Sequence, residues 1–257
     1  MEIITIPCLY DNYSYLIIGD NQADVSVVDP SEAWPVMREL GSRGLKLKAV
    51  LCTHHHHDHI GGTDDLLDEY PDLRVIGFKE DSGRIPQLTE LLADEDSFTV
   101  GAVSGEMFHT PGHTSSSVVF HIDNKLFVGD TLFGAGCGRL FEGTVEQMTE
   151  SLARIVSRGQ GTELYFGHEY TALNLRFAAQ VEPGNSAIQQ RIRMVEEMRK
   201  SNKPSSPSTI EEELQTNPFL RPTEPGIIEY LEERVGLSNH EPVQVFTALR
   251  ELRNHFS

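Results

Sequence analysis

One stretch of the chain, Thr53-His54-His55-His56-His57-Asp58-His59-Ile60-Gly61-Gly62, decides how the rest is interpreted. It places five histidines and one aspartate within seven residues. Neutral imidazole is the commonest metal ligand in proteins, and carboxylate is its usual partner for a divalent ion. Because one ion needs three or four such groups, this stretch alone nearly supplies a metal site.

The spacing inside the stretch favours two neighbouring ions over one. Leu47 to Cys52 is typical of a buried strand that ends at the histidines, and Ile60 to Tyr70 is typical of a helix. At a strand end, His54 and His56 point to one side, and His55 and His57 point to the other. An aspartate and a further histidine come next, as the chain turns into the helix.

Further ligands are expected at other strand ends, because open α/β sites collect side chains from several loops. His113, Asp130 and His168 each follow a short predicted strand and a glycine, which permits a tight turn. Taken singly, such a histidine is more often an ordinary surface or core residue. Asp29, at the end of another predicted strand, is either a carboxylate that orients an imidazole or a simple turn aspartate.

The composition limits the classes of function. The chain has 257 residues, 39% of them hydrophobic, so it can bury a core as one large domain or as a domain with an appendage. The formal net charge of -18 disfavours nucleic acid and anionic membrane as partners. No apolar run is long enough for a transmembrane helix, and the N-terminus does not resemble a signal peptide. Three scattered cysteines argue against a disulfide framework, so we expect a cytoplasmic protein, and nothing indicates more than a monomer.

The pattern of predicted secondary structure changes near residue 170. Before it, short apolar runs alternate with turns and helical stretches, which predicts an α/β domain over residues 1–170. After it, four segments are typical of helices and predict a helical domain over residues 171–257: Ala172 to Val181, Ser186 to Ser201, Gly226 to Arg234 and Glu241 to His255.

The pattern Thr-His-x-His-x-Asp-His, with a later histidine, aspartate and histidine at strand ends, resembles the metallo-β-lactamase fold superfamily. The resemblance implies an αβ/βα sandwich with two divalent metal ions, zinc first and iron or manganese as other choices. It assigns three ligands to each ion and one carboxylate to bridge them: His54, His56 and His113; Asp58, His59 and His168; and Asp130.

Longer matches resemble the glyoxalase II, or hydroxyacylglutathione hydrolase, family and cover nearly the full chain. They lie at Gly129 to Arg139, Gly167 to Thr171, Val181 to Asn185, Asn217 to Arg221 and Arg250 to Arg253. The family resemblance implies a thioester hydrolase that cleaves S-D-lactoylglutathione to D-lactate and glutathione, in methylglyoxal detoxification. A hydroxide held by the two ions would attack the thioester, with Asp58 orienting it. Cys137 has no evident activating partner and is interpreted as structural.

The same resemblance implies a site for the glutathione moiety, whose two carboxylates require cations. It places the substrate contacts at Arg139, Tyr170, Arg250 and Arg253. The family often has lysine where this chain has Arg139 and Arg253, and tyrosine where it has Phe141. On spacing alone, Arg250 and Arg253 are also explained as a basic last turn that stabilises the dipole of a helix.

Three other functions remain open from the sequence. One is another metallo-β-lactamase-fold hydrolase, acting on a lactam, a lactone or a different thioester. A second is an iron persulfide dioxygenase, which would hold one ion per chain. A third is a non-catalytic metal-binding protein, which leaves the strand-end ligands and the terminal arginines unexplained.

Overall fold

The computed structural model describes residues 1–256, which divide into two compact units. The first unit consists of residues 1–110, 116–129 and 165–168, and the second of residues 111–115, 130–164 and those from Glu169 onward. Within the described residues, no helix is long and apolar enough to span a bilayer.

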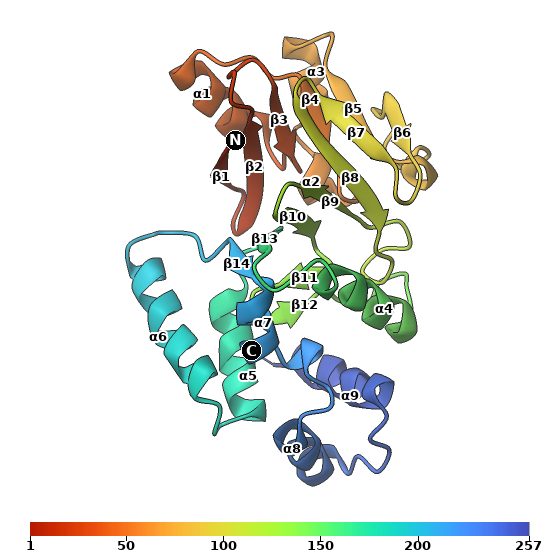
Figure 1. The fold of residues 1–257 in the computed structure, drawn as a ribbon, viewed down its shortest axis with the longest axis vertical. Helices are drawn as coiled ribbons and strands as arrows, with labels where there is room; N and C mark the ends of the chain where they lie inside the picture. Colours follow the sequence, from red (N-terminus) through yellow and green to blue (C-terminus); the bar gives the residue numbers. More distant parts are fainter. Residues whose placement is uncertain (257) are drawn as a thin grey trace. The chain divides into compact units, whose positions relative to one another are not determined.

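The first sheet belongs to the first unit and mixes strand directions (Figure 1). Its first three strands are antiparallel, and the third to sixth are parallel to one another. In spatial order, which is also chain order, they are β1 (Glu2–Cys8), β2 (Asn12–Ile18), β3 (Val25–Val28), β4 (Ala49–Leu51), β5 (Arg74–Phe78) and β6 (Glu90–Leu92).

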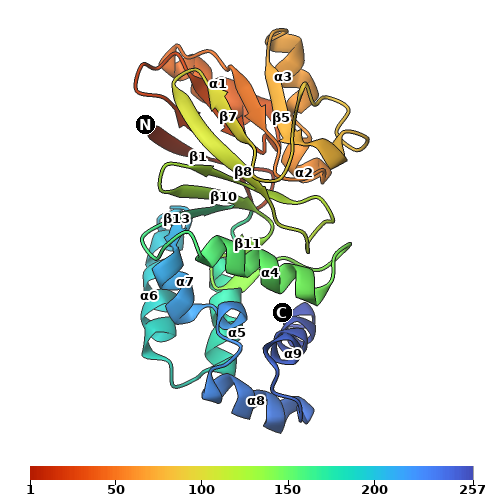
Figure 2. The ribbon, with the colours of Figure 1, turned by 45° about the vertical axis from the view of Figure 1, so that its right-hand side comes forward.

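The second sheet consists largely of antiparallel hairpins, which Figure 2 shows side by side. Its strands in the first unit, in spatial order, are β13 (Glu163–Phe166), β10 (Lys125–Gly129), β9 (Val118–Ile122), β8 (Val103–His109) and β7 (Ser97–Val100). In the second unit, β14 (Ser208–Thr209) pairs with the first two residues of β13.

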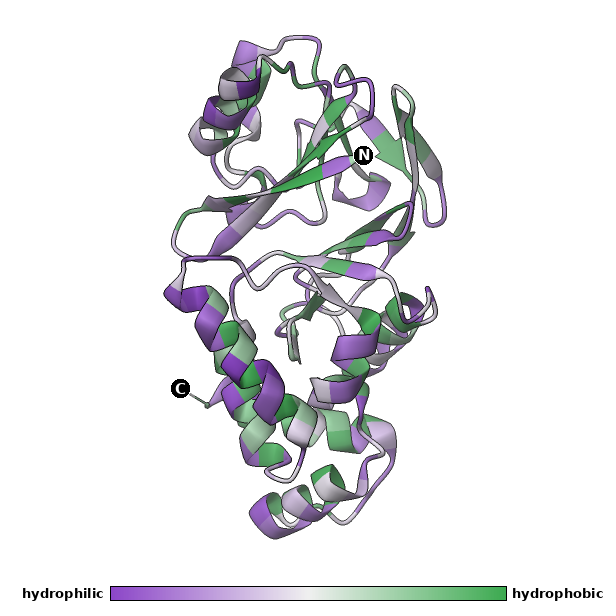
Figure 3. Ribbon diagram, turned by 60° about the vertical axis from the view of Figure 1, so that its left-hand side comes forward, coloured by the Kyte–Doolittle hydropathy of each residue, from purple (hydrophilic) through white to green (hydrophobic). Residues whose placement is uncertain are grey.

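The first unit has two hydrophobic cores, one on each face of the first sheet, because successive side chains of a strand point to opposite faces. All seven residues of β2 are buried, which requires cover on both faces of the sheet. Tyr15 and Ile17 pack into one core with residues of the second sheet, such as Phe120. Leu16 and Ile18 pack into another core with the helix α1 (Ala33–Arg43) and the helix α3 (Thr63–Glu69). Figure 3 shows the hydrophobic positions as green bands along the strands.

The helix predicted over Ile60 to Tyr70 is interrupted, and this shapes the histidine loop. The structure has a single turn, α2 (His57–Ile60), and then α3, separated by Gly61 and Gly62. A Cβ on Gly62 would lie 2.5 Å from the backbone nitrogen of Ala33, so only glycine permits this close approach. The chain therefore passes close to the start of α1 directly after the histidines.

The second unit is mainly helical and contains a short hairpin. α5 and α6 run side by side (Figures 1 and 2) around a core that includes Leu175, Ile188 and Val195. The hairpin is β11 (Leu132–Phe133) and β12 (Gly136–Cys137). The helices are α4 (Val145–Val156), α5 (Thr171–Val181), α6 (Ser186–Lys200), α7 (Ile210–Thr216), α8 (Pro225–Val235) and α9 (Pro242–Asn254).

A buried ionic network fastens the hairpin to the helices within the second unit. The carboxylate of Glu213, which has no exposed surface, accepts hydrogen bonds from Arg191 at 2.6 Å and from the backbone N–H of Ala135 at 2.8 Å. The amide of Asn217 donates to the same carboxylate and to the carbonyl of Gly136. Because buried charges need paired hydrogen-bonding groups, this network holds the hairpin in one position.

Candidate metal centre

In the loop after β4, His54 and His56 lie on the same side, as the alternation of side chains at the end of a strand predicts. His54 is 1% exposed, and its Nδ1 lies 3.0 Å from the hydroxyl of Thr53. Its Nε2 lies 3.1 Å from Nδ1 of His56. The two imidazoles thus bring one nitrogen each to a common point.

Three further donor atoms converge within the first unit. Nε2 of His59 lies 3.3 Å from Nε2 of His168, and Oδ2 of Asp58 lies 3.7 Å and 3.4 Å from these two nitrogens. Two ligands that each lie about 2.0–2.1 Å from one tetrahedral ion are roughly 3.3 Å apart. The spacing and chemistry of these donors therefore fit a divalent ion.

Two buried or partly buried carboxylates orient the imidazoles of this trio. Asp29 accepts a hydrogen bond from Nδ1 of His59 at 2.8 Å, and Asp11 accepts one from Nδ1 of His168 at 2.9 Å. Each bond fixes the proton on Nδ1 and directs the lone pair of Nε2 to the common point. Asp29 thus takes the first of the two roles that the sequence left open. Asp11 was missed, because an Asp-Asn pair between two strands indicates only a turn.

His113 and Asp130 lie together in the second unit. Nδ1 of His113 donates to the carbonyl of Arg139 at 2.9 Å, and its Nε2 lies 3.5 Å from Oδ2 of Asp130. A Cβ on Gly138 would lie 2.0 Å from the carbonyl oxygen of Asp130, so the chain needs glycine there. These two side chains supply one imidazole and one carboxylate at ligand spacing.

The other two histidines of the opening stretch take different directions. Nδ1 of His55 lies 3.5 Å from a carboxylate oxygen of Asp81, which also pairs with Arg84. His57 is exposed and begins α2. Neither belongs to a group of convergent donors.

The arginines predicted to bind substrate lie in the second unit. Nη1 of Arg250 donates to the carbonyl of Cys137 at 2.7 Å, and Nε of Arg253 donates to the side chain of Asn174 at 3.0 Å. Burial first, and then the charges of Arg250 and Arg139, lower the pKa of Arg253 to about 10. Three like charges therefore act on one another, which makes this region electropositive in an acidic chain.

Helix capping explains these arginines only in part. Arg253 lies in the last turn of α9 and donates to the carbonyl of Phe256 at 3.4 Å, as a helix-end cation does. Arg250 instead bonds to the hairpin and stacks its guanidinium 5.1 Å from the ring of Phe219.

The remaining predicted substrate contact of the second unit is the aromatic residue Tyr170. The ring of Tyr170 packs against Phe133 at 5.2 Å between centroids. Phe141 is 62% exposed and packs against the imidazole of His113 at the same separation. Cys137 is 5% exposed, and its burial raises the pKa of the thiol, so it is not a ready nucleophile.

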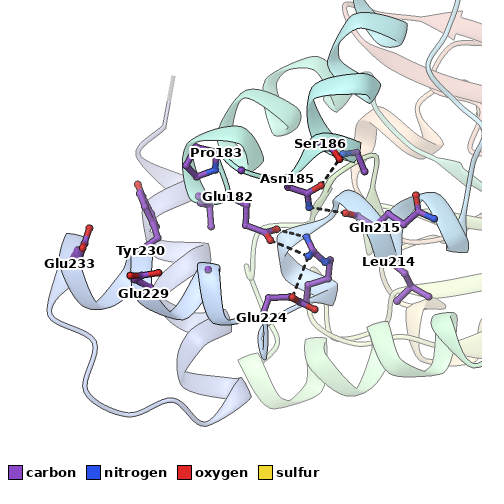
Figure 4. Close-up of a pocket in the computed structure, with 15 residues that line it drawn as sticks. Glu182, Pro183, Asn185, Ser186, Leu214, Gln215, Glu224, Glu229, Tyr230 and Glu233 are labelled. Atoms are coloured by element: carbon purple, nitrogen blue, oxygen red, sulfur yellow. Dashed lines mark hydrogen bonds and ion pairs between the residues drawn. The ribbon is translucent and has the colours of Figure 1, made fainter.

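A cavity of about 950 Å³ also lies in the second unit, apart from every predicted site residue (Figure 4). Glu182 and Arg221, which pair with each other, line the cavity together with Glu224, Glu229 and Tyr230. The charged residues of its lining are four glutamates and one arginine, which does not suit a dianionic ligand.

The sequence matches two family models that together cover nearly the whole chain. Residues 10–168 match the model described as "Metallo-beta-lactamase superfamily", and residues 169–256 match "Hydroxyacylglutathione hydrolase C-terminus". The two matches meet at residues 168 and 169. The domain boundary near residue 171 stays a prediction.

Relatives with curated names are similar over their full length. A hydroxyacylglutathione hydrolase of Synechococcus sp. (strain JA-2-3B'a(2-13)) is 44% identical, with 100% of each chain covered. One of Methylococcus capsulatus is 43% identical over 100% of this chain and 99% of that protein.

Solved structures share the fold at lower identity. ETHE1 from Myxococcus xanthus superposes with a TM-score of 0.66 at 23% identity, covering 98% of each chain. The BLEG-1 B3 metallo-beta-lactamase superposes with a TM-score of 0.65 at 24% identity, covering 85% of this chain and 99% of that one. The αβ/βα sandwich with a C-terminal helical region is thus confirmed, and the chain belongs to the hydroxyacylglutathione hydrolase family of the metallo-β-lactamase superfamily.

Proposed function

We propose that this protein is a thioester hydrolase that cleaves S-D-lactoylglutathione, a 2-hydroxyacylglutathione, to D-lactate and glutathione. Its physiological role would then be in methylglyoxal detoxification. The observation that carries the proposal is the 44% identity, over the whole chain, to a hydroxyacylglutathione hydrolase. The convergent histidine and aspartate donors supply the chemistry that such a hydrolysis requires.

The proposed cofactors are two divalent ions, zinc by preference and iron or manganese as other choices. The ligand assignment follows the order of the family motif along the chain. One ion would be held by His54, His56 and His113, the second by Asp58, His59 and His168, and Asp130 would be a ligand common to both. The donor spacings of 3.1 Å between His54 and His56 and 3.3 Å between His59 and His168 support this assignment.

When bound, the two ions supply an acidified water and polarise the carbonyl group of the substrate. Asp58 would orient the attacking water, because its Oδ2 lies 3.4 Å and 3.7 Å from the two ligand nitrogens and its side chain is partly exposed. The water oxygen adds to the thioester carbon and loses its protons to solvent, the C–S bond breaks, and the sulfur leaves with the bonding electrons and takes up a proton. A thiolate leaves readily, so the site needs no strong general acid.

Binding of the glutathione moiety is assigned to Arg139, Tyr170, Arg250 and Arg253. The lowered pKa of Arg253 supports this role, because its charge is disfavoured by burial and by two neighbouring arginines. A ligand with two carboxylates would relieve that repulsion and accept charge-assisted hydrogen bonds. We further propose that the enzyme works as a cytoplasmic monomer on this small substrate, without nucleic acid or membrane as a partner.

One assay on one sample tests the function and its principal alternative. The metal content of the purified protein is measured as isolated and again after loading with zinc, and release of free thiol from S-D-lactoylglutathione is followed. We expect two ions per chain and thiol release that stops after chelation. No thiol release from fully loaded protein would overturn the proposal. One iron per chain, together with oxygen uptake on a persulfide substrate, would establish the dioxygenase instead.

A further inference from the structure

The turn between β1 and β2 is fastened to the end of β13. The backbone N–H of Tyr13 donates to the carbonyl of Gly167 at 2.8 Å, and Asn12 forms an isolated antiparallel bridge with His168. Figure 1 shows the closed end of this hairpin beside β13. Asp11, in the turn, and Asn12, the first residue of β2, are thereby brought to the trio of donors formed by Asp58, His59 and His168.

Asp11 holds the imidazole of His168. Its Oδ1 accepts a hydrogen bond from Nδ1 of His168 at 2.9 Å, and its side chain is 26% exposed. The bond joins residues 157 positions apart, so it contributes nothing to the local turn. It sets the tautomer of His168 and the rotation of its ring.

Asn12 holds the carboxylate of Asp58. Its Nδ2 donates to the main-chain carbonyl of Asp58 at 3.0 Å and to Oδ2 at 3.1 Å. Asn12 is 4% exposed, whereas the side chain of Asp58 is 41% exposed and would otherwise sample several rotamers. A buried amide that spans 46 residues to reach a partly exposed carboxylate restrains that carboxylate in one orientation.

We propose that Asp11 and Asn12 are positioning residues that tune the affinity of one metal site, the one formed by Asp58, His59 and His168. The inference rests on the proposed function, which supplies the two ions. With Asp29 on His59, each of the three ligands has one residue that orients it. The hydrogen bonds of Asp11 and Asn12 go to Asp58 and His168 and, among the described residues, not to His54 or His56, so their loss should weaken mainly one of the two ions.

The test compares Asp11→Ala, Asp11→Asn and Asn12→Ala with the wild type and with Asp123→Asn. Asp123 is a matched control, because it is an exposed aspartate in the turn of another hairpin of the same unit, between β9 and β10. Zinc binding is measured by competition with a chromophoric chelator, and the ring N–H of His168 is followed by NMR. The melting temperatures of the metal-free proteins report whether each variant folds.

In Asp11→Ala and Asn12→Ala we expect one ion to bind as in the wild type and the other about 10–100-fold more weakly. Asp11→Asn keeps an acceptor without the charge, so its loss of affinity should be smaller than that of Asp11→Ala. The ring N–H signal of His168 should shift in both Asp11 variants and stay in Asp123→Asn.

The inference is overturned if folded Asp11→Ala and Asn12→Ala bind both ions as tightly as Asp123→Asn does. In that event, a wild type that holds two ions and releases thiol leaves the proposed function standing. A wild type that binds no second ion overturns the inference and the dinuclear mechanism together.

Discussion

At the scale of single residues, the carboxylate of Asp29 accepts three hydrogen bonds. It accepts hydrogen bonds from the backbone N–H and the hydroxyl of Thr53, at 2.8 Å and 2.6 Å, and from His59. It is 2% exposed and has a φ of 48°, in the left-handed region that residues other than glycine rarely adopt. Its bonds therefore maintain a backbone conformation that costs roughly 1–3 kcal/mol.

Replacing Asp29 by alanine should lower the free energy of unfolding of the metal-free protein by about 2–4 kcal/mol, because buried donors lose their acceptor. Urea denaturation measures this. Asp123→Ala is the control, since Asp123 is exposed and has a φ of 52°; it should cost only about 1 kcal/mol. Equal costs for the two variants would mean that the backbone conformation, and not the hydrogen bonds, determines the effect.

For Arg250→Ala we expect KM to rise by about 10–100-fold, with a much smaller fall in kcat, because a charged hydrogen bond to the substrate is lost. Steady-state kinetics on S-D-lactoylglutathione measures both constants. Arg234→Ala is the control, since Arg234 is an exposed arginine in the last turn of α8. An unchanged KM with a lowered melting temperature would assign Arg250 to the fold alone, through its bond to Cys137.

At the scale of elements, the break between α2 and α3 rests on glycine for a steric reason. Gly62 has an ordinary φ of -86°, yet a Cβ there would lie 2.5 Å from one backbone atom of α1 and 2.6 Å from an atom just before it. Gly41 lies inside α1, and a Cβ there would meet nothing within 4 Å. Both glycines have right-handed helical backbone conformations, but only Gly62 has backbone atoms close to the position of a Cβ.

Gly62→Ala should therefore destabilise the protein by about 1–3 kcal/mol and weaken zinc binding, because the backbone must move beside the histidine loop. Gly41→Ala, the matched control, should stabilise it by up to about 1 kcal/mol, because alanine favours the helix. Chemical denaturation of both variants checks the signs. A neutral Gly62→Ala would contradict the close approach of the two helices.

The helices with strong periodicity were predictable from the sequence. α5, α6, α8 and α9 begin and end within one residue of their predicted positions. β11 and β12 have two residues each and show no period, so they were missed. α4 was also missed, although Thr144 and Gln147 form a capping box that marks its start.

The candidate ligands could be predicted where they lie close together in the sequence. The residues that orient them could not, because they contact the ligands from distant positions in the chain. His54, His56 and Asp58 stand in one conspicuous stretch. Asp11 and Asn12 carry only a turn signal, because their partners lie 157 and 46 residues away along the chain. No local pattern encodes such a pairing, so only the folded chain reveals it.

At the scale of the whole molecule, the proposed ligands span residues 54 to 168, so metal loading should stabilise much of the fold. A ligand that binds only the folded state adds about 2.7 kcal/mol at 100 times its Kd, which raises the melting temperature of a chain of this size by roughly 5–10 °C. Calorimetry with and without a chelator measures the shift. His57→Ala should retain the shift, since His57 is exposed, and His59→Ala should lose the part of the shift that the second ion contributes. A shift equal in both variants would contradict a specific site.

The burial of all three cysteines has a consequence for a protein that is proposed to release a thiol at every turnover. Cys8, Cys52 and Cys137 are buried, and desolvation raises the pKa of each thiol. Mixed disulfides and acyl transfer both require an accessible thiolate. The three thiols of the enzyme are therefore poor partners for coupling with glutathione or with its thioesters.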